Sequence, residues 1–577
     1  MRVLLLCHSF NSLSQRLWVA LRDDGHQVSV ELDIADAVTE EAVALWRPDV
    51  VVASFMKRKI PESVWSTRPC LVVHPGPPGD RGPSALDWAV LRGEPAWGVS
   101  VLQANEAFDA GPVRAHAAFA MRATPEATKA SLYRREVSAE AVAAVREALA
   151  RLSQAGPAAP AGRWQPLMTQ ANRAIDWLSD DTATVLRKLR AADGFPGVAG
   201  SLFGQPAHLF DAHAATAEAL ARVPGAERHA PGTVIAKRGP AVLVRTRDGG
   251  LWLGHVRRAP DQAGGLTLKL ATTQAFALEA AALPELAVPL KRDDAAEYDE
   301  LHYQEFGPDG ARVGWLSFAF HNGAMGTRQC QRLQAALQTL RQRPTQVLVL
   351  AGGPDFFSNG IHLHDIEAHA DQPGDSAADA SWRNINAMND VALEVLTLTD
   401  RLTVSALRGN AGAGGCFLAL AADEVWAHGG VVLNPHYKNM GNLYGSEYWT
   451  YTLPRRVGPE QALRIMQGRL PMGAAEAQRL GLVDAVLGDE ALAFEPLALA
   501  RALALAEQPD LGARLAAKQA AREADEAHQP LAAYREAELQ RMHRNFYGFD
   551  PSYHVARHHF VHRKPHAWTP RHLALHR

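Results

Sequence analysis

The chain has 577 residues, of which 47% are hydrophobic and 21% charged, and its formal net charge is −3 at pH 7. This length exceeds what one hydrophobic core supports and predicts roughly three or four domains. The charge balance argues against nucleic acid or an anionic membrane as a partner, no apolar run approaches a membrane span, and four scattered cysteines without zinc spacing favour the reducing cytoplasm.

Residues 1 to about 150 alternate short apolar runs with helical patterns. The runs at 3–6, 28–32, 50–54, 71–73 and 98–102 predict buried strands. The helical stretches between most of them favour a parallel, Rossmann-like α/β sheet. Ligands of such sheets bind at the carboxyl ends of the strands, so the loops after the first, third and fourth strands are the candidate sites.

The middle of the chain predicts a small β-barrel of the OB-like type. An Ala/Pro/Gly-rich stretch at 153–162 predicts the first linker. A helical pattern and several short strands follow, and Asp248, Gly249 and Gly250 between two apolar runs indicate a hairpin. An acidic, Ala-rich stretch near 281–300 predicts the second linker.

The alternation of strands and helices resumes from about residue 311. Strand patterns at 313–320 and 345–352 flank a helical pattern at 328–343, and the chain after about 490 is mostly helical. We therefore expect an α/β multidomain protein. Its predicted domains are, in chain order, 1–160 (α/β), 163–280 (β-barrel), 300–490 (α/β) and 491–577 (helical C-terminal extension).

The segment 72–113 contains a strand that ends in histidine, then an Arg-Gly, a Gly-Val strand and an Asp-x-Gly-Pro sequence. It resembles the catalytic block of formyltransferases and hydrolases that use 10-formyltetrahydrofolate. The resemblance implies that His74 and Asp109 are catalytic. A histidine can move a proton at the tetrahedral carbon of formyl transfer, and a carboxylate sets its tautomer. Val72 stands where that family has asparagine, so one oxyanion donor is absent; the alternative for His74 is a turn histidine beside a buried strand.

The same resemblance implies a folate pocket lined by the backbone after the third strand. Its predicted contacts come from three loops and are Gln15, Ser54, Lys57 and Arg81. Arg58 and Lys59 are neighbouring cations. For Lys57, Arg58 and Lys59 the alternative interpretation is a solvated loop.

Three blocks of the second half, at 347–366, 407–427 and 455–487, resemble the crotonase (enoyl-CoA hydratase/isomerase) superfamily in order and spacing. The resemblance implies an acyl-CoA thioester bound in an oxyanion hole made of two backbone N–H groups, from Ile361 and Gly414. Gly360 and Gly415 are the predicted CoA-binding glycines, since glycine lets the backbone approach a ligand closely. The alternative is ordinary tight packing of a strand against a helix.

The two glutamates of the hydratases are replaced in this chain. They should fall at 417 and near 436–437, where the sequence has Phe417, His436 and Tyr437. Water therefore cannot be activated in the usual way. Tyr437 and the nearby Glu447 are the predicted replacement, a phenol and a carboxylate that relay a proton. The alternatives are a packed aromatic for Tyr437 and a surface salt bridge for Glu447.

The two resemblances imply that 1–160 and 163–280 are formyltransferase-like and that 300–490 is crotonase-like, a ββα spiral. A formyl-folate half joined to a CoA half resembles the hydrogenase maturation factors HypX/HoxX. That resemblance implies two reactions: formyl passes from 10-formyltetrahydrofolate to coenzyme A, and formyl-CoA is then decarbonylated to CO and CoA. The CO would become a ligand of the iron in NiFe-hydrogenase, whose large subunit or other maturation proteins are the expected partners. The alternatives are a formyl-folate hydrolase fused to an independent acyl-CoA isomerase, and a non-catalytic scaffold that senses folate and CoA.

The last 24 residues contain seven histidines. We predict a basic tail folded over the CoA phosphates, with Arg557 and Arg563 as the contacts. His558 and His562 stand i, i+4, the spacing of two metal ligands on a helix face. A metal site is the alternative, and no metal is predicted. Because formyl-CoA is hydrolysable, we also expect the two halves to share one enclosed passage.

Overall fold

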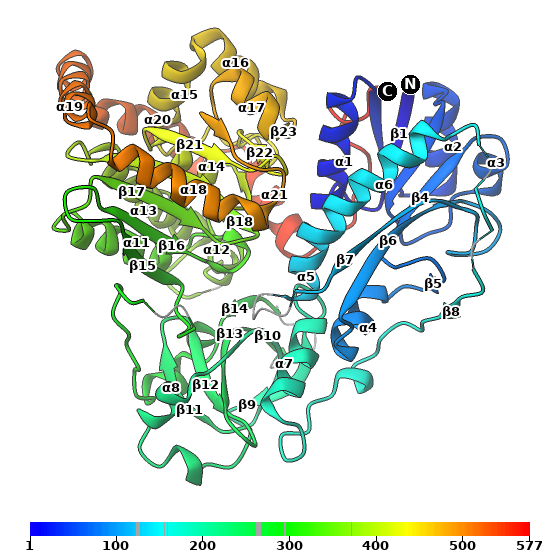
Figure 1. Cartoon of the computed structure of the whole chain (residues 1–577), viewed down its shortest axis with the longest axis horizontal. Coiled ribbons are helices and arrows are strands. Elements are labelled where there is room, and N and C mark those ends of the chain that lie inside the picture. Colours follow the sequence, from blue (N-terminus) through cyan, green and yellow to red (C-terminus); the bar gives the residue numbers. More distant parts are fainter. Residues whose placement is uncertain (123–126, 155, 159, 261–266, 294–295, 371) are drawn as a thin grey trace. The chain divides into compact units, whose positions relative to one another are not determined.

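The chain folds into two compact units (Figure 1). The computed structural model describes residues 1–577 except 123–126, 155, 159, 261–266, 294–295 and 371. Unit 1 comprises residues 1–287, 296–298 and 566–577, and unit 2 comprises 288–295 and 299–565. Both parts of the formyl-folate half lie in unit 1, and the C-terminal end of the chain returns to it. The division into four domains stays a prediction.

Unit 1 begins with a six-stranded sheet. Its strands, in spatial order, are β2 (Gln27–Leu32), β1 (Arg2–Cys7), β3 (Val50–Phe55), β4 (Cys70–His74), β6 (Ala96–Gln103) and β7 (Val113–Ala120). The five predicted strands are all present. The first four are parallel as predicted, but β6 runs antiparallel to β4 and to β7. The prediction of a wholly parallel sheet is therefore wrong at this edge, because an apolar run carries no information on strand direction.

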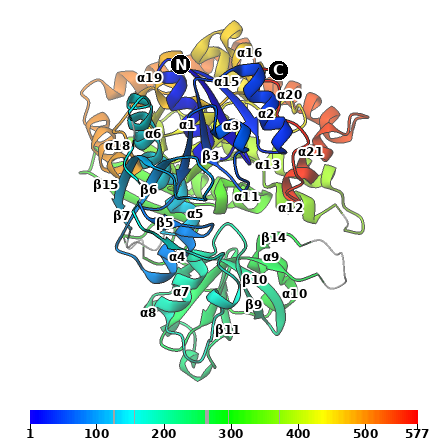
Figure 2. The same cartoon turned by 90° about the vertical axis from the view of Figure 1, so that its right-hand side faces the viewer.

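Both faces of this sheet are covered by helices, which explains its continuous apolar strands. The helices are α1 (Ser12–Asp23), α2 (Asp36–Trp46), α3 (Glu62–Trp65), α4 (Ala85–Arg92), α5 (Lys129–Leu132) and α6 (Ser138–Ala150). Helices α1 and α6 pack on each other and on the sheet, whereas Ala42 of α2 and Val64 of α3 share a core with Leu4 and Leu6 of β1 (Figure 2). Alternate residues of the strands thus enter two different cores.

The second part of unit 1 is a curled antiparallel sheet. Its strands, in spatial order, are β11 (Val234–Arg238), β12 (Ala241–Arg245), β13 (Gly250–Arg258), β10 (Gln205–Ala214) and β9 (Val198–Leu202), with β14 (Lys269–Ala271) also on β13. The predicted hairpin joins β12 to β13. The helices of this part are α7 (Thr182–Ala191), α8 (Ala217–Ala221), α9 (Thr272–Ala275) and α10 (Ala277–Ala281). A separate pair of short strands, β5 (Asp80–Arg81) and β8 (Arg163–Trp164), precedes this sheet in the chain.

Unit 2 contains the ββα spiral of a crotonase fold. The larger sheet has, in spatial order, β15 (Leu301–Phe306), β16 (Val313–Phe318), β17 (Val347–Gly352), β19 (Leu402–Leu407), β21 (Glu424–Ala427) and β24 (Ala485–Val486). The smaller has β18 (Phe356–Ser358), β20 (Asn410–Gly412), β22 (Val432–Asn434) and β23 (Met472–Gly473). Each of β18, β20 and β22 follows a strand of the larger sheet and pairs with its counterpart from the next turn of the spiral. The predicted fold class is confirmed.

Helices fill both sides of the larger sheet. The helices of unit 2 are α11 (Thr327–Leu340), α12 (Leu363–Ala368), α13 (Ala377–Leu396), α14 (Gly414–Leu420), α15 (Trp449–Val457), α16 (Pro459–Gly468), α17 (Ala474–Leu480), α18 (Ala491–Ala506), α19 (Leu511–His528), α20 (Leu531–Tyr547) and α21 (Ser552–Val561). Leu348 and Leu350 of β17 face α11 and α13, whereas Val347 and Val349 face Phe494 of α18. Among the helices that the structure describes, none has the length and apolar character needed to span a bilayer.

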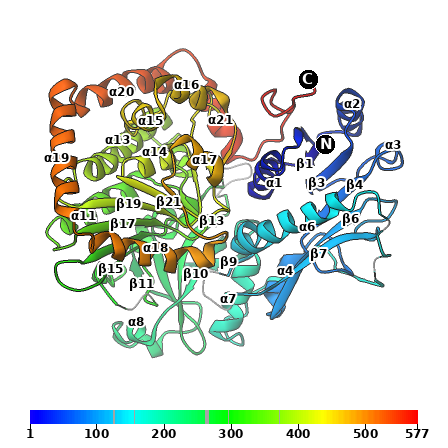
Figure 3. The same cartoon turned by 45° about the horizontal axis from the view of Figure 1, so that its top comes forward.

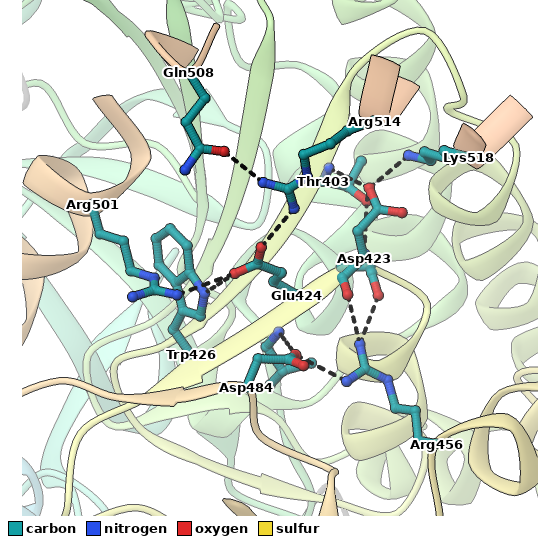
Figure 4. A network of polar contacts seen from close by, with 12 residues as sticks. Thr403, Asp423, Glu424, Trp426, Arg456, Asp484, Arg501, Gln508, Arg514 and Lys518 are labelled. Carbon is teal, nitrogen blue, oxygen red and sulfur yellow. Dashed lines mark hydrogen bonds and ion pairs between the residues drawn. The ribbon is translucent and has the colours of Figure 1, made fainter. Parts of the chain in front are cut away.

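The helices after residue 490 pack on the spiral (Figure 3), and charged side chains fix α19 to it (Figure 4). Lys518 of α19 donates to the Asp423 carboxylate at 2.7 Å and to the carbonyl of Arg401 at 2.8 Å. Arg514, one turn earlier, donates to Glu424 at 3.1 Å. Asp423 and Glu424 stand at the start of β21. These contacts attach the helical extension at several points to the end of the larger sheet where β21 begins.

The last twelve residues complete the first sheet of unit 1. Strand β2 lies at the edge of that sheet, where backbone groups would otherwise face solvent. The N–H of Val30 donates to the carbonyl of Leu573 at 2.9 Å, and the N–H of Leu32 donates to the Thr569 hydroxyl at 2.8 Å. The tail therefore closes the β2 edge.

A buried carboxylate on β2 is neutralised by the same tail. Glu31 is 0% exposed and lies 2.8 Å from Nε2 of His576 and 2.9 Å from the Arg577 guanidinium. Burial alone would raise the pKa of Glu31, but hydrogen bonds from His576, Thr569 and Arg577 outweigh it and lower that pKa. The C-terminus thus supplies the countercharge for a strand near the N-terminus.

Candidate active sites

His74 stands between two carboxylates in unit 1. It ends β4 and is 4% exposed. Its Nε2 lies 2.8 Å from Oδ2 of Asp80, and its Nδ1 lies 3.6 Å from Oδ1 of Asp109. The predicted histidine and aspartate are therefore close together. Asp80 was missed by the sequence prediction, although it lies six residues after His74 in the same glycine-rich loop.

The loop around His74 has a shape that glycine makes possible. A Cβ on Gly76 would lie 2.6 Å from Nε2 of His74 and 2.4 Å from Oδ2 of Asp80. Asp109 has φ +49°, which is a strained value for a residue other than glycine, and its Oδ2 accepts a hydrogen bond from the N–H of Gly82 at 3.1 Å. The carboxylates are thus oriented by backbone geometry as well as by the histidine.

The four predicted folate contacts have different surroundings. Ser54 is buried and its hydroxyl lies 2.8 Å from that of Ser14. Gln15 donates to the carbonyl of Phe10 at 3.0 Å, and Lys57 is exposed in the loop after β3. Arg81 donates to the carbonyl of Phe108 at 2.9 Å, next to Asp109. Arg81 therefore helps to hold the loop of a catalytic candidate, and folate binding by these four residues stays a prediction.

In unit 2 the glycine-rich run brings β18 and the start of α14 into direct contact. A Cβ on Gly415 would lie 2.0 Å from the carbonyl oxygen of Ser358, and a Cβ on Gly360 would lie 3.2 Å from the backbone nitrogen of Gly414. Ala413, before the helix, has φ +47°. The backbones of Gly360 and Gly414 therefore lie side by side, as an oxyanion hole between Ile361 and Gly414 requires.

Tyr437 and Glu447 form a buried hydrogen-bonded pair against this helix start. Glu447 is 0% exposed and Tyr437 is 5% exposed. The Tyr437 hydroxyl bonds Oε2 of Glu447 and lies 2.9 Å from the carbonyl oxygen of Ser446. A Cβ on Gly414 would lie 2.7 Å from Oε1 of Glu447. The alternative of a surface salt bridge for Glu447 is thus wrong, and the carboxyl lies at the predicted oxyanion hole.

The protonation state of the pair follows from its burial. Burial raises the pKa of Glu447 to about 8 and raises that of Tyr437 well above its ordinary value. At pH 7 Glu447 is therefore mostly neutral. A single hydroxyl hydrogen of Tyr437 cannot serve both acceptors at once. The consistent arrangement has Glu447 donating to Tyr437, and Tyr437 donating to the carbonyl of Ser446; ionisation of Glu447 reverses the first bond.

Phe417 forms an apolar wall beside the pair. Its ring stacks on that of Tyr437 with centroids 5.2 Å apart and planes inclined by 15°, and it is fully buried. On Gly445 a Cβ would lie 2.1 Å from the Tyr437 ring, so Gly445 provides the space for that ring. The position of a hydratase glutamate is thus filled by an aromatic ring that contacts the proposed proton relay.

The predicted phosphate contacts of the tail lie on or after α21. Arg557 is buried and its Nε donates to Oε2 of Glu367 at 2.6 Å. His558 and His562 approach Oε1 of the same carboxylate at 3.1 and 3.0 Å, while Arg563 is exposed with φ +50°. The ligand atoms of Glu367, His558 and His562 lie within 4.8 Å of one another, a spacing that a metal ion would also accept. The roles of both arginines and the absence of a metal stay predictions.

Family models match the chain in the order of its domains. The formyl transferase model matches residues 25–149, the formyl transferase C-terminal domain model matches 167–264, and the enoyl-CoA hydratase/isomerase model matches 320–571. The two resemblances recognised in the sequence are thereby confirmed.

Full-length relatives combine the same parts. The chain is 54% identical to the hydrogenase maturation factor HoxX of Bradyrhizobium diazoefficiens, over 100% of this chain and 97% of that protein. It is similar to the crystal structure of HypX from Aquifex aeolicus in complex with tetrahydrofolic acid, with a TM-score of 0.93, 44% identity, and 100% of this chain and 99% of that chain covered. A methionyl-tRNA formyltransferase of Burkholderia pseudomallei is 28% identical over 36% of this chain and 63% of that enzyme.

Proposed function

The chain belongs to the HypX/HoxX family of hydrogenase maturation factors, and from this premise we propose that it makes carbon monoxide for the iron of NiFe-hydrogenase. Unit 1 transfers the formyl group of 10-formyltetrahydrofolate to the thiol of coenzyme A. Unit 2 decarbonylates the resulting formyl-CoA to CO and CoA. The tetrahydrofolate bound to HypX of Aquifex aeolicus supports the folate half of this scheme.

The histidine between two carboxylates supports formyl transfer in unit 1. Attack on the formyl carbon creates an oxyanion and requires movement of a proton. His74 is the group that moves the proton, and Asp80 and Asp109 orient its ring and stabilise its charged form. Val72 offers no side-chain donor in place of the family's asparagine, and this departure from the family counts against the formyl-folate hydrolase alternative.

The buried acid–phenol pair supports decarbonylation in unit 2. Formyl-CoA has no α-carbon, so alkene chemistry is excluded. Its breakdown cleaves the C–H and C–S bonds of the formyl carbon and forms one S–H bond, without net oxidation. The N–H groups of Ile361 and Gly414 bind the formyl oxygen, while Glu447 and Tyr437 accept the formyl proton and return it to sulfur. A base with a pKa of about 8 is well matched to this task near neutral pH.

Phe417 is the single observation that carries the proposal. A carboxylate at this position would hold water beside the thioester, and water converts formyl-CoA to formate. The Phe417 ring, stacked on Tyr437, instead excludes water from the reacting group. The proposed function of this unusual residue is therefore to protect the CO-forming reaction from hydrolysis.

The test follows a ¹³C-labelled formyl group from 10-formyltetrahydrofolate in the presence of CoA. Labelled CO is expected from the intact chain, whereas labelled formate alone would indicate the hydrolase–isomerase alternative and no turnover would indicate the scaffold. His74→Ala should stop CO release from formyl-folate but not from added formyl-CoA. Phe417→Glu should shift the product from CO toward formate, and an unchanged ratio would contradict the role of Phe417.

The site of action and the partners follow from the same proposal. All four cysteines are free, which supports a reducing compartment such as the cytoplasm. The acceptor of the CO is a hydrogenase large subunit or another maturation protein that carries the iron. Neither nucleic acid nor membrane has a part in the proposed reaction.

A further inference from the structure

A second buried carboxyl lies beside Glu447 and has no part in the chemistry proposed above. Glu538, on α20, is 0% exposed. Its Oε2 accepts a hydrogen bond from the N–H of Tyr448 at 3.0 Å. Its Oε1 accepts from the N–H and the hydroxyl of Thr450 at 2.9 and 2.6 Å. The acceptors of Glu538 are thus used by the segment that directly follows Glu447.

The backbone that Glu538 holds is strained at two consecutive residues. Glu447 has φ +60° and Tyr448 has φ +58°, values that residues other than glycine rarely adopt. Such residues persist only where their surroundings over-determine them, and they cluster at functional sites. The position of the Glu447 carboxyl depends directly on this strained backbone.

Two helices supply the support for this segment. Oδ1 of Asn389, on α13, accepts from the N–H of Glu447 and from the Ser446 hydroxyl, each at 2.7 Å. Glu538 accepts from the next N–H, that of Tyr448. Asn389 and Glu538 therefore bind successive backbone donors through the strained residues.

Glu538 also replaces a missing helix cap. Tyr448 is the N-cap residue of α15 and its side chain makes no capping hydrogen bond. The first N–H groups of a helix need acceptors from elsewhere, and a carboxylate is favourable there because of the helix dipole. The carboxylate of Glu538, from a helix 88 residues later in the chain, takes that place at Thr450.

The two carboxyls also interact through their charges. Burial raises the pKa of Glu538 to about 7, and the charge of Glu538 adds to the burial that raises the pKa of Glu447. Tyr437, Tyr444, Tyr448 and Cys330 are the other titratable groups that interact electrostatically with one or both carboxyls. Asp390, Arg535 and Arg541 are the charged groups that act on these tyrosines and this cysteine. Removing the Glu538 charge therefore lowers the pKa of Glu447.

We propose that Glu538 is a positioning residue for decarbonylation: it fixes the strained backbone of Glu447 and Tyr448 so that the Glu447 carboxyl lies against Gly414. The helical extension thus completes the active site of the crotonase fold rather than only covering it. This inference rests on the proposed function, because it assumes that Tyr437 and Glu447 are the proton relay.

The test compares Glu538→Gln with Glu536→Gln, which changes an exposed acid of the same helix. In Glu538→Gln the new side-chain amide can still accept from Thr450 but turns a donor toward the N–H of Tyr448. We expect kcat for CO release from formyl-CoA to fall by roughly 10- to 10²-fold, as for a misplaced catalytic group. KM should stay within about twofold, because neither the oxyanion hole nor the nucleotide is touched. The acid limb of the pH–rate profile should move to lower pH. The control Glu536→Gln should match the wild type in kcat, KM and pH–rate profile.

Thr450→Val provides a milder variant in case Glu538→Gln does not fold, since it removes one hydrogen bond to Glu538 and keeps the backbone donors. It should lower kcat less than Glu538→Gln and leave KM unchanged. A wild-type kcat in both variants would overturn the proposal. A pH–rate profile that shifts while its maximal kcat stays at the wild-type value would also overturn it, because Glu538 would then act only through its charge. The wild type and Tyr437→Phe, assayed in parallel, separate the levels. If the wild type releases no CO from formyl-CoA, the proposed function fails. If Tyr437→Phe retains full CO release, the proton relay on which this inference rests is wrong, and if it loses CO release while the Glu538 variants do not, only the present inference fails.

Discussion

At the scale of single residues, Tyr437 and Glu447 form one hydrogen-bonded pair and should act as one unit. The pair is buried, and each residue is the hydrogen-bond partner of the other. We expect Tyr437→Phe and Glu447→Gln each to lower CO release from formyl-CoA by roughly 10²-fold or more, a typical general acid–base contribution. The double variant should be little worse than either single variant, since the removal of one member already disables the relay. The initial rate of CO release is measured for the two single variants and the double variant.

CoA binding is the control for this comparison. It should survive in every variant, because the proposed oxyanion donors are backbone N–H groups that side-chain substitutions leave in place. Multiplicative losses would mean that Tyr437 and Glu447 perform separate steps, and near-normal CO from Tyr437→Phe would direct attention to His362 and His436.

The burial of Glu447 also makes stability depend on pH. Its pKa is raised from 4.5 to about 8 in the folded protein. Between these values the folded state keeps a proton that the unfolded chain releases, so the free energy of unfolding falls as pH rises. The contribution is at most about 1.4 kcal/mol per pH unit. The free energy of unfolding of unit 2, measured with urea from pH 5 to 8, should therefore change less with pH in Glu447→Gln than in the wild type. The same pH dependence in both proteins would contradict the raised pKa.

The residues found from the sequence are those within contiguous motifs. His74, Asp109, Gly414 and Tyr437 could be placed because short runs around them resemble known blocks. Glu538 could not, because its contact with Tyr448 joins positions 90 residues apart and its helix shows only an ordinary amphipathic pattern. A buried acid on a mostly polar helix becomes visible only when the packing is known.

At the scale of elements, apolar runs predicted where strands lie but not how they pair. All five strands expected in the first sheet exist, yet β7 was missed because its more buried positions alternate with Arg114, His116 and exposed alanines and so form no continuous apolar run. Strand direction also depends on the connection. The link from β4 to β6 includes α4 but returns the chain antiparallel.

The anchoring of α19 gives a prediction at this scale. Lys518 is largely buried, and burial lowers its pKa, while Asp423 opposes that change. Lys518→Met keeps the apolar stem but removes the ammonium donor of the Leu398 and Arg401 carbonyls and the cation that pairs with Asp423, which keeps only its hydrogen bonds from Thr403. We expect unit 2 to lose about 1–3 kcal/mol of unfolding free energy, the cost of unsatisfied buried groups. Denaturant unfolding measures this, with Lys564→Met, an exposed lysine beyond α21, as the control.

At the scale of the whole molecule, residues 566–577 should be essential for unit 1 although they come last in the chain. Their deletion exposes the β2 edge and leaves the buried Glu31 without its partners. Removing the partner of a buried charge costs about 3–5 kcal/mol. A truncated chain ending at 565 should therefore show earlier thermal unfolding of unit 1 and faster proteolysis near β2. Adding Glu31→Gln should recover part of the loss; no recovery would mean that the edge, not the charge, is what the tail protects.

The expected passage of formyl-CoA between the two halves is tested by comparing the intact chain with its separated units. The phosphopantetheine arm spans roughly 15–20 Å when extended, from its bond count. If one bound CoA serves both sites, the two units supplied as separate chains should give less CO and more formate than the intact protein. Unit 1 must then carry residues 566–577 as an added segment, since a cut near 287 alone removes its edge cover. Equal CO yield from the separate units would exclude the passage.

The path of the tail also sets an order for protein synthesis. Glu31 leaves the ribosome early, whereas its partner Arg577 follows 546 residues later. At about 5–20 residues per second, the first sheet waits on the order of a minute for its last strand-edge contacts. During that time the edge of β2 is uncovered, and the Glu31 carboxyl lacks its partners, so that both are accessible to other nascent chains. Completion of unit 1 therefore requires translation as far as Arg577, and a product terminated before that residue carries an unfinished unit 1 that quality-control proteases can recognise.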